Sequence, residues 1–181
     1  MQAGPLEHFH RIHDLFARLQ APSSLIGGWA AVAWGVVRAT KDVDLLADLS
    51  NPGKATVLAA LRKAGYSPDW RTGGEDDPIP ELLHIGRKGS DLAVDVIVAH
   101  KAFDFAALRR CRKVRLGSWN APVLAPEDLV AMKLFAGGAL DFEDARGILQ
   151  TQTGKIDQDT LLQACQSLRV TKALALLRKS L

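Results

Sequence analysis

Residues 25–45 have the sequence LIGGWAAVAWGVVRATKDVDL and carry the strongest fold signal in the chain. The stretch opens with a short apolar run that ends in paired glycines, and a helix-compatible segment follows from Trp29 to Trp34. Residues 42–48 alternate between charged and apolar side chains and then become apolar, which is typical of a mostly buried strand. The stretch therefore predicts a strand, a glycine turn, a helix and a second strand.

The segments on either side continue a mixed pattern of helices and strands. Apolar residues recur every three or four positions over 5–20, which predicts an amphipathic helix. Residues 81–88 and 92–99 are β-compatible runs separated by few residues, so they predict a hairpin that turns at Gly89-Ser90. Further elements are expected as follows: a helix over 53–64, a breaker-rich loop over 71–80, a helix over 101–111, extended pieces over 114–123 broken by Gly117 and Pro122, and a helix from Pro126 to Gly137-Gly138.

Two or three more helices complete the chain, and the whole order predicts an α+β fold. We expect a mixed β-sheet flanked by helices over 1–124 and a helical C-terminal portion over 125–181, within one compact domain. The chain has 181 residues, of which 48% are hydrophobic, and this is enough for a sizeable buried core.

Charge and cysteine content exclude several classes of protein. Lys and Arg number 23 against 20 Asp and Glu, and the net charge of +3 is too small to indicate nucleic acid by itself. The two cysteines, Cys111 and Cys165, exclude a disulfide framework and a CxxC zinc site. No apolar run approaches the roughly 18 residues of a membrane span, so we expect a soluble, cytoplasmic protein without a membrane partner.

Three acids stand out in or next to predicted strands. Asp42 and Asp44 are separated by one residue, so a strand places both on one face, about 7 Å apart or less, where a divalent cation can bind. Asp95 lies in an otherwise apolar run, where an ionised carboxylate is costly unless it is paired or metal-bound. If the two strands are neighbours, the three acids converge on a Mg²⁺ site. The alternatives are a solvated edge strand and a pairing of Asp95 with Arg38 or Arg87.

Gly27-Gly28 separates the first predicted strand from the helix that follows. Glycine lets a backbone approach a ligand closely, and free N–H groups at a helix start favour phosphate, although paired glycines also make ordinary turns. Since one helix separates this turn from Asp42 and Asp44, the glycines and the carboxylates can meet at one end of the sheet.

Taken together, these residues resemble the nucleotidyltransferase superfamily. The segment over 25–45 is similar to that of its small bacterial members, among them the aminoglycoside and lincosamide nucleotidyltransferases and the AbiEii-like toxins. Their pattern is an apolar residue, Gly-Gly or Gly-Ser, a helix, Asp-x-Asp or Asp-x-Glu, and a third acid on a later strand. Arg38 and Thr40 match an Arg-x-Thr that often precedes the acid pair in these proteins.

The resemblance extends into the helical portion. In these proteins a Lys on a helix recurs with a later Asp-x-x-Asp, and here Lys133 is followed by Asp141 and Asp144. Many members also have an Arg between the Lys and the acids, where this chain has residues 137–140, so Arg146 is the alternative phosphate contact. The chain is also shorter than drug-modifying enzymes with a full acceptor domain, which argues against antibiotic transfer.

The resemblance implies a metal-dependent enzyme that moves a nucleoside monophosphate from an NTP to a hydroxyl. It implies Mg²⁺ or Mn²⁺ as cofactor, with two ions about 3.5–4 Å apart. Candidate acceptors are tRNA and protein, and an antitoxin is a candidate partner. The roles that it implies are as follows: Asp42, Asp44 and Asp95 catalytic and metal-binding, Gly27, Gly28, Arg38, Thr40 and Lys133 nucleotide-binding, and Asp144 supporting.

Several alternatives stay open at this point. Lys133 either contacts phosphate or is solvated, as lysines on amphipathic helices commonly are, and Arg38 either contacts phosphate or pairs with Asp42. The basic run over 109–115 either guides RNA or a nucleotide by its field or forms a solvated face. The protein itself is an enzyme, a toxin that uses the same chemistry, or a non-catalytic nucleotide-binding or interaction domain.

Overall fold

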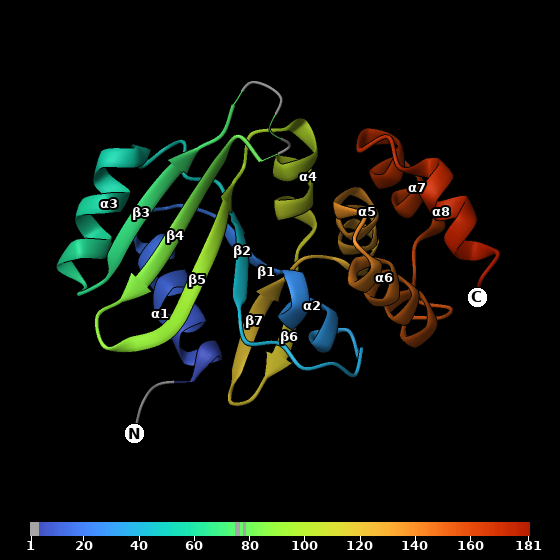
Figure 1. Cartoon of the computed structure of the whole chain (residues 1–181), viewed down its shortest axis with the longest axis horizontal. Coiled ribbons are helices and arrows are strands. Elements are labelled where there is room, and N and C mark those ends of the chain that lie inside the picture. The colour runs from blue at the N-terminus through green and yellow to red at the C-terminus, as the bar shows by residue number, and fades with distance from the viewer. Residues whose placement is uncertain (1–3, 75–76, 78) are drawn as a thin grey trace.

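The structure is a computed structural model that describes residues 4–74, 77 and 79–181, with the backbone alone for residues 90–92. Within this part of the chain, seven strands form one mixed sheet in the order β3-β4-β5-β2-β1-β7-β6 (Figure 1). The strands have these bounds: β1 Ser23–Ile26, β2 Val43–Ala47, β3 Ser67–Thr72, β4 Glu81–Arg87, β5 Ser90–Val98, β6 Arg112–Leu116 and β7 Trp119–Val123.

Helices flank this sheet and form the C-terminal part of the described chain. In Figure 1, α1 and α3 lie at one side of the sheet, whereas α5 to α8 gather at the other side of the molecule, beyond α2 and α4. The helices have these bounds: α1 Pro5–Arg18, α2 Gly27–Ala33, α3 Gly53–Lys63, α4 Ala102–Arg110, α5 Pro126–Ala136, α6 Ala139–Thr151, α7 Gln158–Ser167 and α8 Thr171–Arg178. This arrangement confirms the predicted α+β fold class. The division of the chain near residue 125 stays a prediction.

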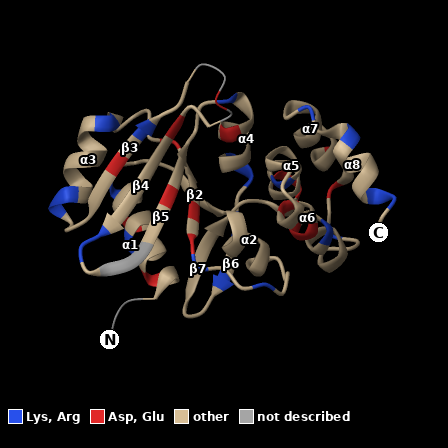
Figure 2. Cartoon of the chain, viewed as in Figure 1, with Lys and Arg blue, Asp and Glu red and all other residues tan. Residues whose placement is uncertain are grey.

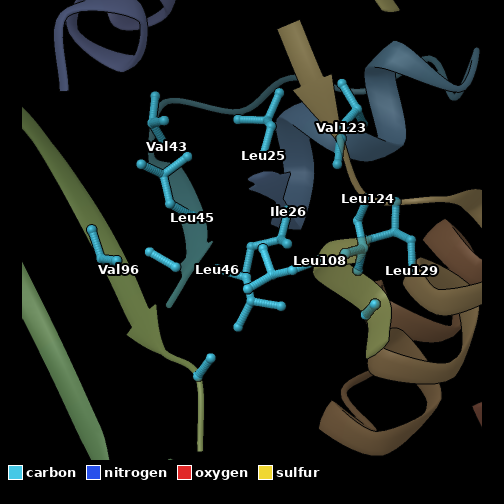
Figure 3. Close-up of a cluster of buried hydrophobic side chains, with 14 of the residues drawn as sticks. Leu25, Ile26, Val43, Leu45, Leu46, Val96, Leu108, Val123, Leu124 and Leu129 are labelled. Atoms are coloured by element: carbon cyan, nitrogen blue, oxygen red, sulfur yellow. The ribbon is translucent and has the colours of Figure 1, made fainter. Parts of the chain in front are cut away.

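Strand β2 lies at the centre of the sheet. It pairs antiparallel with β1 and parallel with β5, and four of its five residues are buried. Figure 3 shows Leu45 of β2 and Val96 of β5 in the hydrophobic core, together with Leu108 of α4 and Leu129 of α5. Because apolar side chains from strands and helices pack around β2, the polar residue in this strand, Asp44, is held in a fixed position.

Strands β3 and β7 differ from the expected pattern. β3 extends to Thr72, so the predicted loop over 71–80 begins later, and residues 75, 76 and 78 of that loop lie outside the described residues. Pro122 does not break β7, because β7 pairs with β1 only at Val123 and keeps Pro122 in register with Lys113 of β6.

The β4–β5 hairpin turns one residue earlier than predicted. Arg87 pairs with Ser90, so the turn residues are Lys88 and Gly89, and Gly89 has a left-handed φ of 77° that suits glycine. Next to this turn, the β4–β5 pairing shifts its register between Ile85 and Arg87. None of the helices in the described part of the chain combines the length and apolar composition that a bilayer span requires.

Candidate active site

Asp44 and Asp95 lie side by side on neighbouring strands. In the parallel pairing of β2 with β5, Asp44 is in register with Asp95, and paired strands lie about 4.8 Å apart. Figure 2 shows acidic segments on both strands at this place in the sheet. Asp42 precedes β2 by one residue and is exposed. The sheet therefore brings two of the three predicted carboxylates together, and Asp42 lies at the solvent side of the pair.

The surroundings of Asp44 raise its pKa from an ordinary value of 3.8 to about 6. Burial is the largest cause, and the charge of Asp95 is the second. Asp42 adds to the increase, whereas the charge of Lys133 and a hydrogen bond from the backbone N–H of Gly28 oppose it. Like charges at close range disfavour ionisation of each other, and a bound cation would relieve this repulsion.

The glycine turn lies directly against Asp44. Gly27 has a left-handed φ of 63°, and a Cβ atom at this position would lie 2.0 Å from Asp44 Oδ2. A Cβ atom on Gly28 would lie 2.7 Å from Thr40 Oγ1 and 3.1 Å from Arg38 Cζ. The two glycines are therefore needed for different reasons: the first leaves room for the carboxylate and the second for Thr40 and Arg38. All five of these predicted site residues come together at one end of β1 and β2.

A second group of charges joins the sheet side of the site to the C-terminal helices. Lys133 Nζ of α5 lies 2.9 Å from Asp141 Oδ1 and 2.8 Å from Asp144 Oδ2, both in α6. Asp144 Oδ2 also accepts a hydrogen bond from Arg38 Nη1 at 2.5 Å. The side chain of Lys133 is 10% exposed and that of Asp144 is 2% exposed. Asp144 thus holds the two cations in place.

These contacts correct several of the alternatives left open by the sequence. Lys133 is buried and paired, so its prediction as a solvated lysine is wrong. Arg38 pairs with Asp144, and its alternative pairings with Asp42 and Asp95 are wrong. Arg146 lies 3.5 Å from Glu143 and donates a hydrogen bond to Ser180 Oγ at 3.2 Å.

His84 of β4 belongs to the site although the sequence did not single it out. Its Nδ1 lies 2.6 Å from Asp95 Oδ1, and the two residues are in register in the antiparallel β4–β5 pair. The signal was present in the hairpin pattern. A two-residue turn at Gly89-Ser90 already pairs position 84 with position 95, and the register shift in the actual hairpin restores that pairing.

The basic run over 109–115 has a structural use. Arg110 donates two hydrogen bonds to Asp128, at 2.9 and 2.6 Å, and Arg112 donates to both carboxylate oxygens of Glu127, at 3.0 and 3.1 Å. Glu127 and Asp128 are completely buried at the start of α5. Two arginines of the run therefore neutralise buried acids while remaining exposed themselves, so the run keeps the solvated face that was one of its alternatives.

The donor atoms at Asp44 and Asp95 fit a cation that arrives with a phosphate ligand. Within residues 4–74, 77 and 79–181, no three His, Cys, Asp or Glu side chains already form a metal-binding group. Proteins commonly hold Mg²⁺ with one or two carboxylates, and the phosphates of a substrate complete the shell. The carboxylate pair and the raised pKa of Asp44 suit that arrangement.

Comparisons with known proteins agree with this reading of the fold. No protein-family model matches the chain, and no curated protein sequence matches it. Among solved structures, the chain is similar to the antibiotic-resistance factor ANT(2'')-Ia in solution, with 16% identity and a TM-score of 0.59 over 95% of this chain and 94% of that chain.

Two further structures are similar over most of their length. An antigenic nucleotidyltransferase-like protein from Paracoccidioides brasiliensis has 16% identity and a TM-score of 0.58, over 94% of this chain and 85% of that chain. The lincomycin-bound lincosamide antibiotic adenylyltransferase LnuA has 18% identity and a TM-score of 0.51, over 83% of this chain and 99% of that chain. The chain therefore has the nucleotidyltransferase fold, which confirms the resemblance seen in the sequence.

Proposed function

We propose that this protein transfers a nucleoside monophosphate from an NTP to an acceptor hydroxyl with the help of Mg²⁺ or Mn²⁺. The observation that carries the proposal is the in-register pair of Asp44 and Asp95, with the glycine turn packed against Asp44. A pair of carboxylates close enough to share a divalent cation, in a chain with the nucleotidyltransferase fold, supports this reaction.

In this reaction the acceptor oxygen forms a bond to the α-phosphorus of the NTP. The bond from that phosphorus to the oxygen of the β-phosphate breaks, and pyrophosphate leaves. Asp44 and Asp95 would hold the metal together with Asp42, and bound Mg²⁺ would neutralise charge on the phosphate oxygens. Asp95 is also the candidate for the group that accepts the proton of the acceptor hydroxyl, because carboxylates commonly act as general bases.

Other predicted residues would position the nucleotide. Gly27 and Gly28 allow a close approach of the phosphates to the backbone. Arg38 beside Gly28 and Lys133 near Asp44 would supply positive charge, and Asp144 keeps both in place through its ion pairs. Alignment of the reacting atoms and stabilisation of charge account for most catalysis in phosphoryl-type transfers.

The test is calorimetric titration with each Mg²⁺–NTP, together with a pyrophosphate-release assay, on the wild type and on Asp44→Asn. We expect Asp44→Asn to lose metal-dependent NTP binding and to lower turnover about 1000-fold, since one charge-stabilising group is removed. Asp159→Asn, which changes an exposed acid in α7, is the matched control and should behave as the wild type. Equal binding and turnover by all three proteins would exclude the assignment.

A toxin of a toxin–antitoxin pair would use the same chemistry on a cellular RNA or protein. Incubation with α-labelled NTP and a cell lysate separates these roles, because label is then recovered from the RNA, the protein or the small-molecule fraction. Wild-type protein that binds Mg²⁺–NTP but transfers no label to any fraction would favour the alternative of a non-catalytic nucleotide-binding domain.

A further inference from the structure

A cavity of about 370 Å³ lies between the sheet and the C-terminal helices. It is bordered by the end of β5, the start of α4 and the end of α5, with a contribution from the residue that follows α7. Its walls include Ile97, Phe103, Met132, Phe135, Ala136 and Leu168. A volume of this size suits a small organic molecule, since ligand pockets commonly measure about 300–1000 Å³.

The cavity adjoins the candidate active site through two elements. Ile97 follows Asp95 by two residues in β5, so both side chains are on the same face of the strand, about 7 Å apart. Met132 directly precedes Lys133 in α5, and it also lines the cavity. A molecule in the cavity would therefore lie on the Asp95 face of β5, two residues along the strand from that carboxylate.

The chemistry of the walls is almost entirely apolar. Among the described residues that line the cavity, only Lys101 and Asp104 carry charge. Asp104 Oδ2 accepts hydrogen bonds from the backbone N–H groups of His100 and Lys101, at 2.9 and 2.8 Å, and so caps the start of α4. Lys101 Nζ lies 4.6 Å from the centre of the Phe135 ring. Both charged side chains therefore already interact within the protein.

We infer that this cavity binds the apolar body of the acceptor, so that the acceptor is a small uncharged alcohol with an aromatic or branched aliphatic group near its reacting hydroxyl. The inference rests on the proposed function. Phe135 is 41% exposed although it is a large apolar residue, and a ligand at this place would cover it. Among the described lining residues Asp104 is the one acid, and its Oδ2 already accepts two backbone hydrogen bonds, so an acceptor with several ammonium groups would lose more hydration against these walls than this carboxylate restores.

The methionine content of the chain allows a direct binding test. Met132 is one of only two methionines, so ¹³C-methyl-methionine labelling gives a simple NMR spectrum in which Met132→Leu identifies the cavity signal. The probe is 2-phenylethanol, and glycerol is the polar control. We expect 2-phenylethanol to shift the Met132 methyl signal in a saturable way and glycerol to leave it unchanged. The absence of a shift, or the same shift with glycerol, would overturn the inference.

Two variants link the signal to the cavity. Ala136→Trp places a large ring at an exposed wall position and should weaken 2-phenylethanol binding about tenfold or more, since loss of even one methylene contact in an apolar pocket has such an effect. Ala59→Trp is the matched control, because Ala59 is exposed on α3, far from the cavity lining. Equal weakening in both variants would also overturn the inference.

Activity then separates the inference from the proposed function. With Mg²⁺–NTP present, 2-phenylethanol should accelerate pyrophosphate release more than glycerol does, and Ala136→Trp should remove the difference. If Mg²⁺–NTP binds and is turned over but the two alcohols act alike, the acceptor class is wrong and nucleotidyl transfer stands. If Mg²⁺–NTP does not bind at all, the proposed function fails, and the assignment of an acceptor fails with it.

Discussion

Two acidic sites within this molecule have opposite surroundings. At the start of α5, Asp128 is fully buried and receives two hydrogen bonds from Arg110. In the sheet, Asp44 has another acid, Asp95, as its register partner, and its pKa is raised to about 6. A buried acid with a bidentate arginine is part of the scaffold, whereas a half-buried acid beside a like charge points to a ligand that neutralises both.

Glu127, next to Asp128, is a second buried acid whose charge is balanced within the protein. Both of its carboxylate oxygens accept hydrogen bonds from Arg112 of β6, and one also accepts from the backbone N–H of Asp157 at 3.0 Å. This single side chain therefore connects β6, α5 and the start of α7. No exogenous ligand is needed to balance its charge.

The largest effect that would test this comparison is expected at the scaffold site. Arg110→Ala leaves the buried Asp128 without its partner and should lower the free energy of unfolding by about 3 kcal/mol. The neighbouring Arg109→Ala removes an exposed arginine and should change it by less than about 0.5 kcal/mol. Urea denaturation at pH 7 measures both. Equal effects of the two substitutions would show that Asp128 does not depend on Arg110.

At the sheet site, removal of the Asp44 charge should raise the free energy of unfolding instead of lowering it. The pKa of Asp44 is higher in the folded state than its ordinary value of 3.8, so the folded protein binds an extra proton between pH 3.8 and about 6. Stability without divalent metal therefore falls as the pH rises through this window. Asp44→Asn should be more stable than the wild type by about 2 kcal/mol above pH 6.

Urea denaturation in EDTA at pH 4 and at pH 7.5 measures this difference. The advantage of Asp44→Asn should be much smaller at pH 4, where the carboxyl is protonated in the folded wild type and only about half ionised in the unfolded chain. A variant that is less stable than the wild type at pH 7.5 would contradict the assignment of Asp44 to an unbalanced pair.

The smallest effect is expected from His84, which contacts Asp95 and no part of the scaffold site. His84→Gln keeps a hydrogen-bonding side chain but changes how it orients the carboxylate, and it should weaken apparent Mg²⁺ affinity in the transfer assay about tenfold. His100→Gln, at an exposed histidine 3.8 Å from Glu81, is the control. An unchanged Mg²⁺ dependence in His84→Gln would mean that the histidine does not position Asp95.

The sequence was sufficient for the parts of the site that depend on local order. A glycine turn, a helix and a strand follow one another over 25–45, so the approach of Gly27 to Asp44 follows from chain connectivity. The pairing of His84 with Asp95 follows from the hairpin register. The side-by-side placement of β2 and β5 met the condition for Asp44 and Asp95 to converge.

Contacts between segments that are distant in the chain could not be predicted from the sequence pattern. The partners of Arg110 and Arg112 depend on how α4 and β6 pack against α5, and a helical pattern alone shows only that Glu127 and Asp128 suit a first turn. The cavity has the same origin, because β5, α4 and α5 form its walls jointly. Such features become visible only when the tertiary packing is known.

The ion pairs of Asp144 can form only late in the synthesis of the chain. It binds Arg38, which precedes it by 106 residues, and Lys133, which the ribosome also makes earlier. A nascent chain that extends through β7 but not through α6 contains both sheet carboxylates, yet it lacks the acid that lies between the two cations. The charges of Arg38 and Lys133 are therefore balanced by Asp144 only when α6 has joined the fold.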